Sequence, residues 1–309
     1  MKTRLFVLGL VAVALVGVTL DGAVFHAPAT QEPQRTFRTT ADVVSVEVSV
    51  RRDKRSVVGL TAADFEVLDD GVPQQVDTVS YERLPVDVTV ALDVSASVTG
   101  PVLDQLRRSV RQLKADLGAR DRLKLIAFNM RVLRLMDFRA PGTAGDAALA
   151  SLPGAGSSAI FDTLAVALTG AAPAGRRHLI MVFTDGKDSS SVTDPNVLFD
   201  VARRSTPTVS VVLASATPDL PASSFGGSPR LSIRDLYDRL ANETGGLVVY
   251  THADDDLSST FRRVLSEFRS SYVLYFAPKG VEPAGVHTLD VRVNRPGSDV
   301  RARRSYAWR

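Results

Sequence analysis

The sequence has no cysteine, and this absence excludes several classes of site at once. Without thiols the chain cannot form disulfides, bind zinc through thiolates, use a cysteine nucleophile or carry a lipid attached through cysteine. Export stays compatible with the absence, because secreted domains that are large enough to bury a core fold without disulfides.

The chain also lacks a large excess of charge of either sign. Its 37 lysines and arginines stand against 34 aspartates and glutamates, so the formal net charge is only +3. This balance argues against nucleic acid as a partner. Hydrophobic residues make up 45% of the 309 residues, which is ordinary for a globular protein of one large or two modest domains.

Signals of common enzymes are missing as well. The four histidines are scattered, and no two of them have the spacing of metal ligands. There is no G-x-S-x-G motif, and the glycines at 154 and 156 lack the third glycine of a dinucleotide loop and the lysine of a phosphate loop. A divalent-metal hydrolase is only a minor alternative, because the sequence shows no candidate general base near the predicted site.

The N-terminus has the pattern of a targeting segment. Two basic residues precede the apolar run Leu5–Leu20, and the small residues of Ala27-Pro28-Ala29 offer a cleavage site. Residues 1–29 are therefore predicted to be a signal peptide, or an uncleaved N-terminal anchor, since the run is marginally short for a span of roughly 20 residues. Either interpretation predicts an exported protein, periplasmic or extracellular, that contacts a membrane only through this segment.

Residues 30–40 are polar and predict a linker. Residues 41–84 predict a β-rich segment, because apolar side chains alternate with polar ones from Val44 to Val50, and Phe65, Val67 and Val76–Tyr81 suggest further short strands. The segment has too few residues to bury a core alone.

Between residues 85 and 270 the pattern changes to alternating strands and helices. The predicted strands are Val86–Leu92, Leu123–Phe128, Val132–Met136, His178–Phe183, Val209–Ala214 and Leu247–Tyr250. The predicted helices are Val102–Leu117, Ala159–Leu168, Asn196–Arg204, Ile233–Glu243 and Leu257–Phe268. Strands that are apolar throughout predict an α/β fold with a doubly wound, mostly parallel sheet that is covered on both faces.

Three details refine this α/β region. Only three residues separate the second and third strands, which predicts an antiparallel hairpin at one edge of the sheet. Asp254-Asp255-Asp256 is predicted to cap the last helix rather than to bind a metal. The stretch 213–229, rich in proline, glycine and serine, predicts an exposed loop.

Residues 271–309 predict a second β-rich segment with strands at Tyr272–Phe276, Thr288–Val293 and Val300–Tyr306. In the last strand Arg301, Arg303 and Arg304 are expected on the exposed face, with Ala302 pointing inward. Since each terminal β segment is too small alone, the two are predicted to pair into one β-sandwich around the inserted α/β domain.

Three polar loops follow or precede these elements and carry the most specific signal. Asp93, Ser95 and Ser97 form a D-x-S-x-S motif directly after an apolar strand, Ser157-Ser158 precede a helix, and Asp185 follows another apolar strand. In open α/β sheets ligands bind beyond the carboxyl ends of the strands, so these loops are expected to meet. Their oxygens are ligands that Mg²⁺, Mn²⁺ or Ca²⁺ prefers over Zn²⁺.

The predicted site has at most two carboxylates, so it barely neutralises a dication. A coordination position left to an acidic group of a partner would then be favoured. Asp162, just inside the helix, is expected to interact with the helix dipole rather than with the metal. In the alternative interpretation, Asp93 and Asp185 only cap helices and the serines only form turns.

These motifs resemble those of the von Willebrand factor type A domain, whose metal-ion-dependent adhesion site uses D-x-S-x-S, a threonine before a helix and an aspartate in a T-D-G loop. Asp93, Ser95 and Ser97 match the first element, Ser158 stands where the family has threonine, and Asp185 in Thr184-Asp185-Gly186 matches the third. The resemblance covers roughly residues 86–268, and the flanking β segments are similar to those of bacterial secreted members.

The resemblance implies a non-enzymatic protein that binds Mg²⁺ (or Mn²⁺ or Ca²⁺) and engages a protein partner offering an acidic side chain. Serine at position 158 keeps the hydroxyl but lacks the methyl group that restricts the rotamer, so cation affinity is expected to be lower and Ser157 remains a rival for the role. A module in which the metal only stabilises the loops is the second interpretation.

Overall fold

The computed structural model describes residues 43–81, 84–170, 173, 175–214, 231–252 and 255–308. The described residues all belong to one compact unit, residues 41–309. The predicted leader, the predicted linker, His26 and nearly all of the predicted loop 213–229 lie outside the described residues. None of the helices in the described part is long and apolar enough to cross a membrane.

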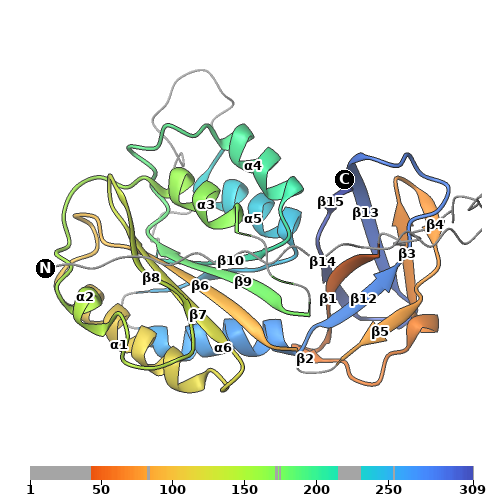
Figure 1. Cartoon of the computed structure of the whole chain (residues 1–309), viewed down its shortest axis with the longest axis horizontal. Coiled ribbons are helices and arrows are strands. Elements are labelled where there is room, and N and C mark those ends of the chain that lie inside the picture. Colours follow the sequence, from red (N-terminus) through yellow and green to blue (C-terminus); the bar gives the residue numbers. More distant parts are fainter. Residues whose placement is uncertain are drawn as a thin grey trace, which may run out of the picture. The chain divides into compact units, whose positions relative to one another are not determined.

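A six-stranded sheet forms the centre of the α/β region (Figure 1). Its strands are β6 (Val86–Asp93), β7 (Arg122–Phe128), β8 (Val132–Arg139), β9 (Arg177–Thr184), β10 (Thr208–Leu213) and β11 (Val248–Tyr250). They lie in the order β11-β10-β9-β6-β7-β8, parallel except for the antiparallel β7–β8 pair at one edge. The predicted doubly wound sheet and its edge hairpin are therefore confirmed.

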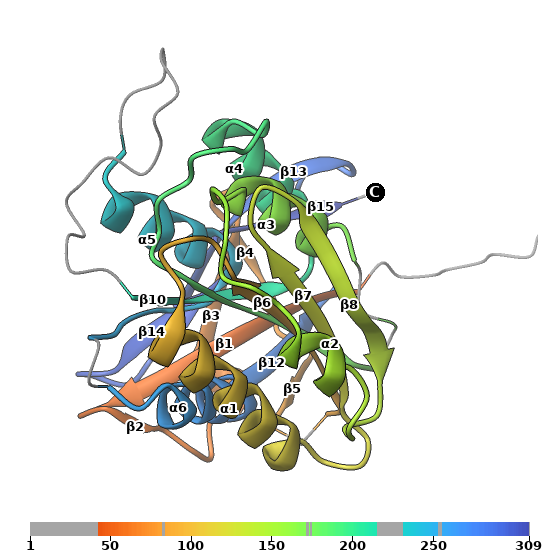
Figure 2. The ribbon, with the colours of Figure 1, turned by 90° about the vertical axis from the view of Figure 1, so that its left-hand side faces the viewer.

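Helices cover both faces of this sheet because each buries one apolar face against it. On one face lie α1 (Gly100–Asp116) and α6 (Leu257–Arg269), side by side in Figure 2; on the other lie α3 (Ile160–Leu168), α4 (Pro195–Arg204) and α5 (Ile233–Thr244). A short helix, α2 (Asp146–Ala150), was not predicted. As predicted, Asp256 caps α6, accepting from the backbone N–H groups of Ser258 and Ser259.

The two terminal β segments pair with each other, as predicted. The strands are β1 (Val44–Arg52), β2 (Arg55–Ser56), β3 (Phe65–Asp69), β4 (Val72–Gln74), β5 (Thr78–Ser80), β12 (Tyr272–Phe276), β13 (Gly285–Val293), β14 (Asp299–Ala302) and β15 (Ser305–Trp308), with a 3₁₀ turn at Ala62–Asp64. One sheet has the order β14-β1-β12-β5, with β2 on β1, and the other β15-β13-β3-β4. Their apolar side chains share one core, to which both ends of the described chain contribute.

The end of the chain differs from the prediction. Instead of one strand at 300–306, β14 and β15 belong to different sheets, and the chain passes between them at Arg303. Arg303 is buried and donates to the carbonyl oxygens of Ser205, Thr206 and Ser305. The predicted exposed arginine face is thus wrong for Arg303, because carbonyl groups at the end of α4 satisfy its guanidinium, while Arg304 is exposed.

Candidate metal-binding site

Asp93 is the last residue of β6 and is fully buried. Its Oδ1 accepts from the backbone N–H of Ser95 at 3.0 Å, and its Oδ2 accepts from Thr184 Oγ1 at 2.7 Å. Ser158 Oγ lies 3.3 Å from both carboxylate oxygens. One carboxylate therefore contacts all three loops that the sequence singled out.

The two serines of the D-x-S-x-S motif lead from this carboxylate to the surface. Ser95 is buried and Ser97 is exposed, and their hydroxyl oxygens lie 3.0 Å apart. Because the motif turns outward directly after β6, it presents a row of oxygens that starts in the core and ends in solvent.

Of the two rival serines, Ser158 is the one that faces Asp93. Its side chain is buried, whereas Ser157 is half-buried. The backbone of Ser158 is held by the following loop: its carbonyl oxygen accepts from the N–H groups of Ser189 and Ser190 at 2.9 and 3.1 Å, and its N–H donates to Ser189 Oγ at 3.1 Å. These bonds fix the backbone of Ser158 at a position from which its hydroxyl reaches Asp93.

Asp185 is half-buried and accepts from the backbone N–H of Lys187 within its own loop, at 3.1 Å. Its neighbour Thr184 makes the direct hydrogen bond to Asp93. Gly186 permits the turn because its φ of +88° is one that glycine adopts without strain. A larger residue would not fit either, since a Cβ at this position would lie 2.7 Å from Ile233 and 2.8 Å from Leu213.

The electrostatics of the site centre on Asp93. Burial raises the pKa of its carboxyl group and the nearby charge of Asp185 raises it further, although the hydrogen bonds from Ser95 and Thr184 act in the opposite direction. A buried carboxylate with little compensating positive charge favours the approach of a cation.

Sequence reasoning missed Asp188, which organises the site without facing it. Asp188 Oδ2 accepts from the first two N–H groups of α3, those of Ile160 and Phe161, at 2.7 and 3.0 Å, and from Ser191 Oγ at 2.5 Å. A signal was available, because Ala159 at the start of the predicted helix has no side-chain oxygen with which to cap it. Asp162 accepts from the backbone N–H groups of Val192 and Thr193.

The donor set fits a hard divalent cation. Carboxylate and hydroxyl oxygens from the end of β6, from the loop before α3 and from the end of β9 lie together, and the hydrogen bonds of the Asp93 carboxylate come from backbone and hydroxyl donors. Oxygen-only sites of this kind suit Mg²⁺, Mn²⁺ or Ca²⁺.

Residues 87–230 match the family model of the von Willebrand factor type A domain. This part of the chain therefore has the von Willebrand factor type A fold. All five predicted site residues lie within it, and so does Asp188. A comparison with curated protein sequences gave no match.

Several solved structures are similar to the von Willebrand factor type A domain and its surroundings. The conserved hypothetical protein BatB from Bacteroides thetaiotaomicron is 18% identical, with 59% of this chain and 98% of that chain covered and a TM-score of 0.46. The D319A mutant of the PilB minor pilin from Streptococcus sanguinis is 14% identical over 61% of this chain and 62% of that chain, with a TM-score of 0.45. A von Willebrand factor type A structure from Catenulispora acidiphila is 12% identical over 88% of this chain and 75% of that chain, with a TM-score of 0.46.

Proposed function

We propose that the domain binds a divalent cation, Mg²⁺ or alternatively Mn²⁺ or Ca²⁺, through Asp93, Ser95, Ser97, Ser158 and Asp185, and that it uses this cation to bind an acidic side chain of a protein partner. The observation that carries the proposal is the buried Asp93 carboxylate, on which hydroxyl groups from two other loops are directed.

The exposure of the site suggests how a partner would take part. Asp93 and Ser158 lie at the inner end, whereas Ser97 is exposed and Asp185 is half-buried. A cation among these oxygens would therefore lie near the surface. With only two carboxylates in the set, a coordination position is left that the carboxylate of a partner can fill.

The same geometry favours binding over catalysis. Among the described residues, no histidine or lysine side chain is hydrogen-bonded to the five proposed ligands. The buried His178 lies at the start of β9, the strand end opposite Asp185, where it contacts Thr89 and Gly170. A hydrolase would need a positioned base. We accordingly propose a non-enzymatic, exported interaction protein with no nucleic-acid partner, which contacts a membrane only if residues 1–29 are retained as an uncleaved anchor.

The alternative, a metal that only stabilises the loops, is the weaker of the two. The loop after β9 is already linked to α3 through Asp188 and Asp162, neither of which belongs to the proposed ligand set. The loops therefore have a scaffold that is independent of the cation.

Calorimetric titration of the chelator-treated protein with Mg²⁺ and Mn²⁺ tests the metal site. Asp185→Ala should weaken cation binding at least tenfold without loss of the fold, because Asp185 is half-buried and bonded only within its loop. Ser158→Thr should strengthen binding, because the added methyl group restricts the rotamer of the hydroxyl. Ser157→Ala is the matched control and should change nothing; equal affinity in all four proteins would contradict the assignment.

The partner role is tested separately, by capture from a cell-envelope extract. Capture that is released by EDTA and is lost in Asp185→Ala is the expected outcome. If EDTA lowers the melting temperature but leaves capture intact, the cation stabilises the loops only. Because burial raises the pKa of Asp93, protons should compete with the cation at a higher pH than for an ordinary aspartate, so affinity should fall on acidification.

A further inference from the structure

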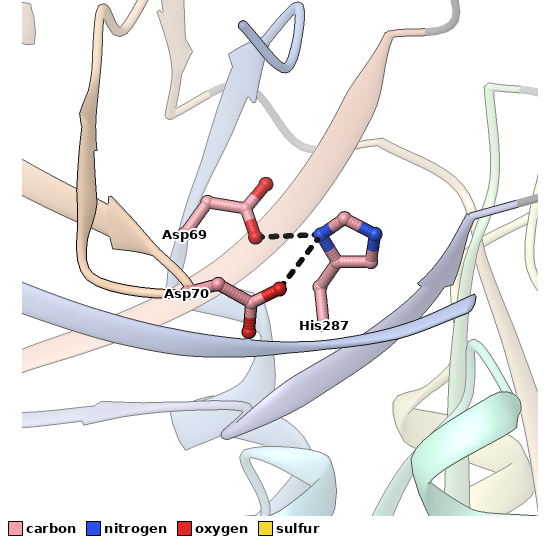
Figure 3. Close-up of side chains that lie close together, drawn as sticks. All are labelled: Asp69, Asp70 and His287. Carbon is pink, nitrogen blue, oxygen red and sulfur yellow. Dashed lines mark hydrogen bonds and ion pairs between the residues drawn. The ribbon is translucent and has the colours of Figure 1, made fainter. Parts of the chain in front are cut away.

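The β-sandwich brings together three side chains that are far apart in the sequence. Asp69 ends β3, Asp70 follows it in the turn to β4, and His287 lies on β13 (Figure 3). His287 Nδ1 lies 2.9 Å from Asp69 Oδ1 and 3.3 Å from Asp70 Oδ2, and the three ligand atoms all lie within 4.8 Å of one another. Both carboxylates are directed at the same imidazole nitrogen.

The charges of this cluster are not balanced by the residues around it. Asp69 and His287 are buried, and in the described part of the chain neither Asp69 nor Asp70 forms an ion pair with a lysine or an arginine. A single imidazole N–H can donate to one carboxylate at a time, and even an imidazolium ion would leave two negative charges against one positive charge. The two carboxylates would therefore be stabilised by more positive charge than His287 alone supplies.

The negative charge of the cluster also affects the neighbouring Tyr306. Its hydroxyl group donates to Asp69 Oδ2 at 2.6 Å. Burial raises the pKa of Tyr306, and the hydrogen bond with Asp69 and the charges of Asp69 and Asp70 raise it further. This bond also fixes the orientation of the Asp69 carboxylate, as outer hydrogen bonds do for metal-binding carboxylates.

The geometry suits three ligands of one ion. Nitrogen–oxygen separations of 2.9 and 3.3 Å are those of neighbouring ligands placed about 2.1 Å from a common centre. The imidazole ring is held from outside by Tyr306 and Trp308, with ring centroids 5.0 and 5.7 Å away. The Asp70 side chain is 46% exposed, so the cluster is open to solvent on that side.

We propose that Asp69, Asp70 and His287 bind a divalent transition-metal ion of the Zn²⁺ type, at a site separate from the one in the von Willebrand factor type A domain. One imidazole nitrogen and two carboxylate oxygens favour Zn²⁺ over Mg²⁺, and water on the Asp70 side completes the coordination. The ion takes the place of the proton on His287 Nδ1, and in a neutral imidazole that proton moves to Nε2, the ring nitrogen that does not face the ion. The ion links β3, from the beginning of the chain, to β13, from its end.

Titration of the full chelator-treated chain with Zn²⁺ tests the proposal, with Asp70→Asn as the deciding variant. Asparagine tolerates the positive φ of Asp70, +45°, and its side-chain oxygen still accepts from the N–H of Thr288, so the fold is retained. Zn²⁺ affinity should fall at least tenfold, and the rise in melting temperature that Zn²⁺ causes in the parent protein should disappear.

Three controls identify the site. Asp53→Asn changes an exposed aspartate that also has positive φ, +50°, and it should keep the Zn²⁺ affinity. His252→Asn removes an exposed histidine that could bind zinc on its own, and it too should change nothing. Asp185→Ala should impair Mg²⁺ binding but not Zn²⁺ binding, so the two sites can fail independently.

Two results would overturn the proposal: no saturable Zn²⁺ binding to the parent protein, or equal binding to the parent and to Asp70→Asn. In either case the cluster is a hydrogen-bond network alone.

Discussion

At the scale of single residues, burial decides what an ionisable side chain does. His178 lies at the start of β9 between Thr89 and the carbonyl oxygen of Gly170, and burial lowers its pKa from 6.5 to about 4. Arg303 is also buried, and burial lowers its pKa to about 10, so it stays charged at neutral pH. Both residues hold segments together rather than forming a site.

The pH dependence of stability tests His178. Folding favours its neutral form, so its contribution is complete above pH 6.5 and is lost as the pH falls toward 4. The loss should be on the order of 3 kcal/mol in total, since one pKa unit corresponds to about 1.4 kcal/mol. Urea unfolding from pH 7 to 4 should show this loss in the parent protein and a smaller one in His178→Gln; equal slopes would contradict the assignment.

Replacing Arg303 should destabilise the protein. Arg303→Ala leaves the carbonyl oxygens of Ser205, Thr206 and Ser305 without their donor, at a cost of about 2–4 kcal/mol in the free energy of unfolding. The neighbouring Arg304 is exposed, so Arg304→Ala is the matched control and should change stability by less than about 0.5 kcal/mol. Similar denaturation midpoints for the two variants would show that the buried bonds contribute little.

At the scale of elements, α3 depends on a residue outside itself. Ala159 cannot cap the helix, and Asp188 of the loop after β9 accepts from its first two N–H groups instead. Asp194, Ser232 and Asp256, by contrast, cap the helices that they precede. The position of Ser158 next to α3 is therefore set by a loop 30 residues later in the chain.

Removing this external cap should affect both stability and the metal site. Asp188→Ala should cost about 1–2 kcal/mol, as the loss of a cap usually does. It should also weaken Mg²⁺ binding, because Ser158 directly precedes the affected turn. Asp200→Ala, on the exposed face of α4, is the control for loss of an aspartate, and calorimetry with denaturant unfolding gives both readouts. If stability fell but Mg²⁺ affinity stayed unchanged, Asp188 would cap α3 without influencing the metal site, and the second part of the prediction would be contradicted.

At the scale of the whole described molecule, the beginning and end of the chain complete each other. β1 pairs with β12 and β14, and β3 pairs with β13, so without the other segment each terminal segment keeps only two-stranded pairs. The two terminal segments also form ion pairs with the von Willebrand factor type A region. Glu47 pairs with Arg177, and Glu267 pairs with Arg51 and Arg301.

Deleting residues 271–309 tests this dependence. β1 loses both principal neighbours and β3 loses β13, so the backbone amides of residues 44–69 should exchange hydrogen as in an unfolded chain. Hydrogen exchange with mass spectrometry measures this, and the full chain provides the reference. Protection of β1 in the shortened chain would contradict a sandwich built from both ends.

Much of the α/β region followed from the sequence. Apolar strands and helices with one apolar face predicted the sheet and its covered faces, because hydrophobic periodicity is a local property of the chain. The pairing of the two β segments was predicted for a different reason, since neither could bury a core alone. The single strand at 300–306 was wrong, because alternation cannot show that a chain changes sheets at a buried arginine.

The sequence by itself determined which residues could serve as cation ligands, because D-x-S-x-S and T-D-G are local motifs that follow apolar strands. It left Ser157 and Ser158 as rivals, and although Ala159 showed that the helix lacks a cap of its own, nothing in the sequence identified Asp188 as the residue that replaces it. Only the tertiary structure placed the Ser158 hydroxyl at Asp93 and joined Asp69 to His287 across 218 positions. The reason is that side-chain direction and long-range proximity depend on how strands pair and loops pack, which no local pattern encodes.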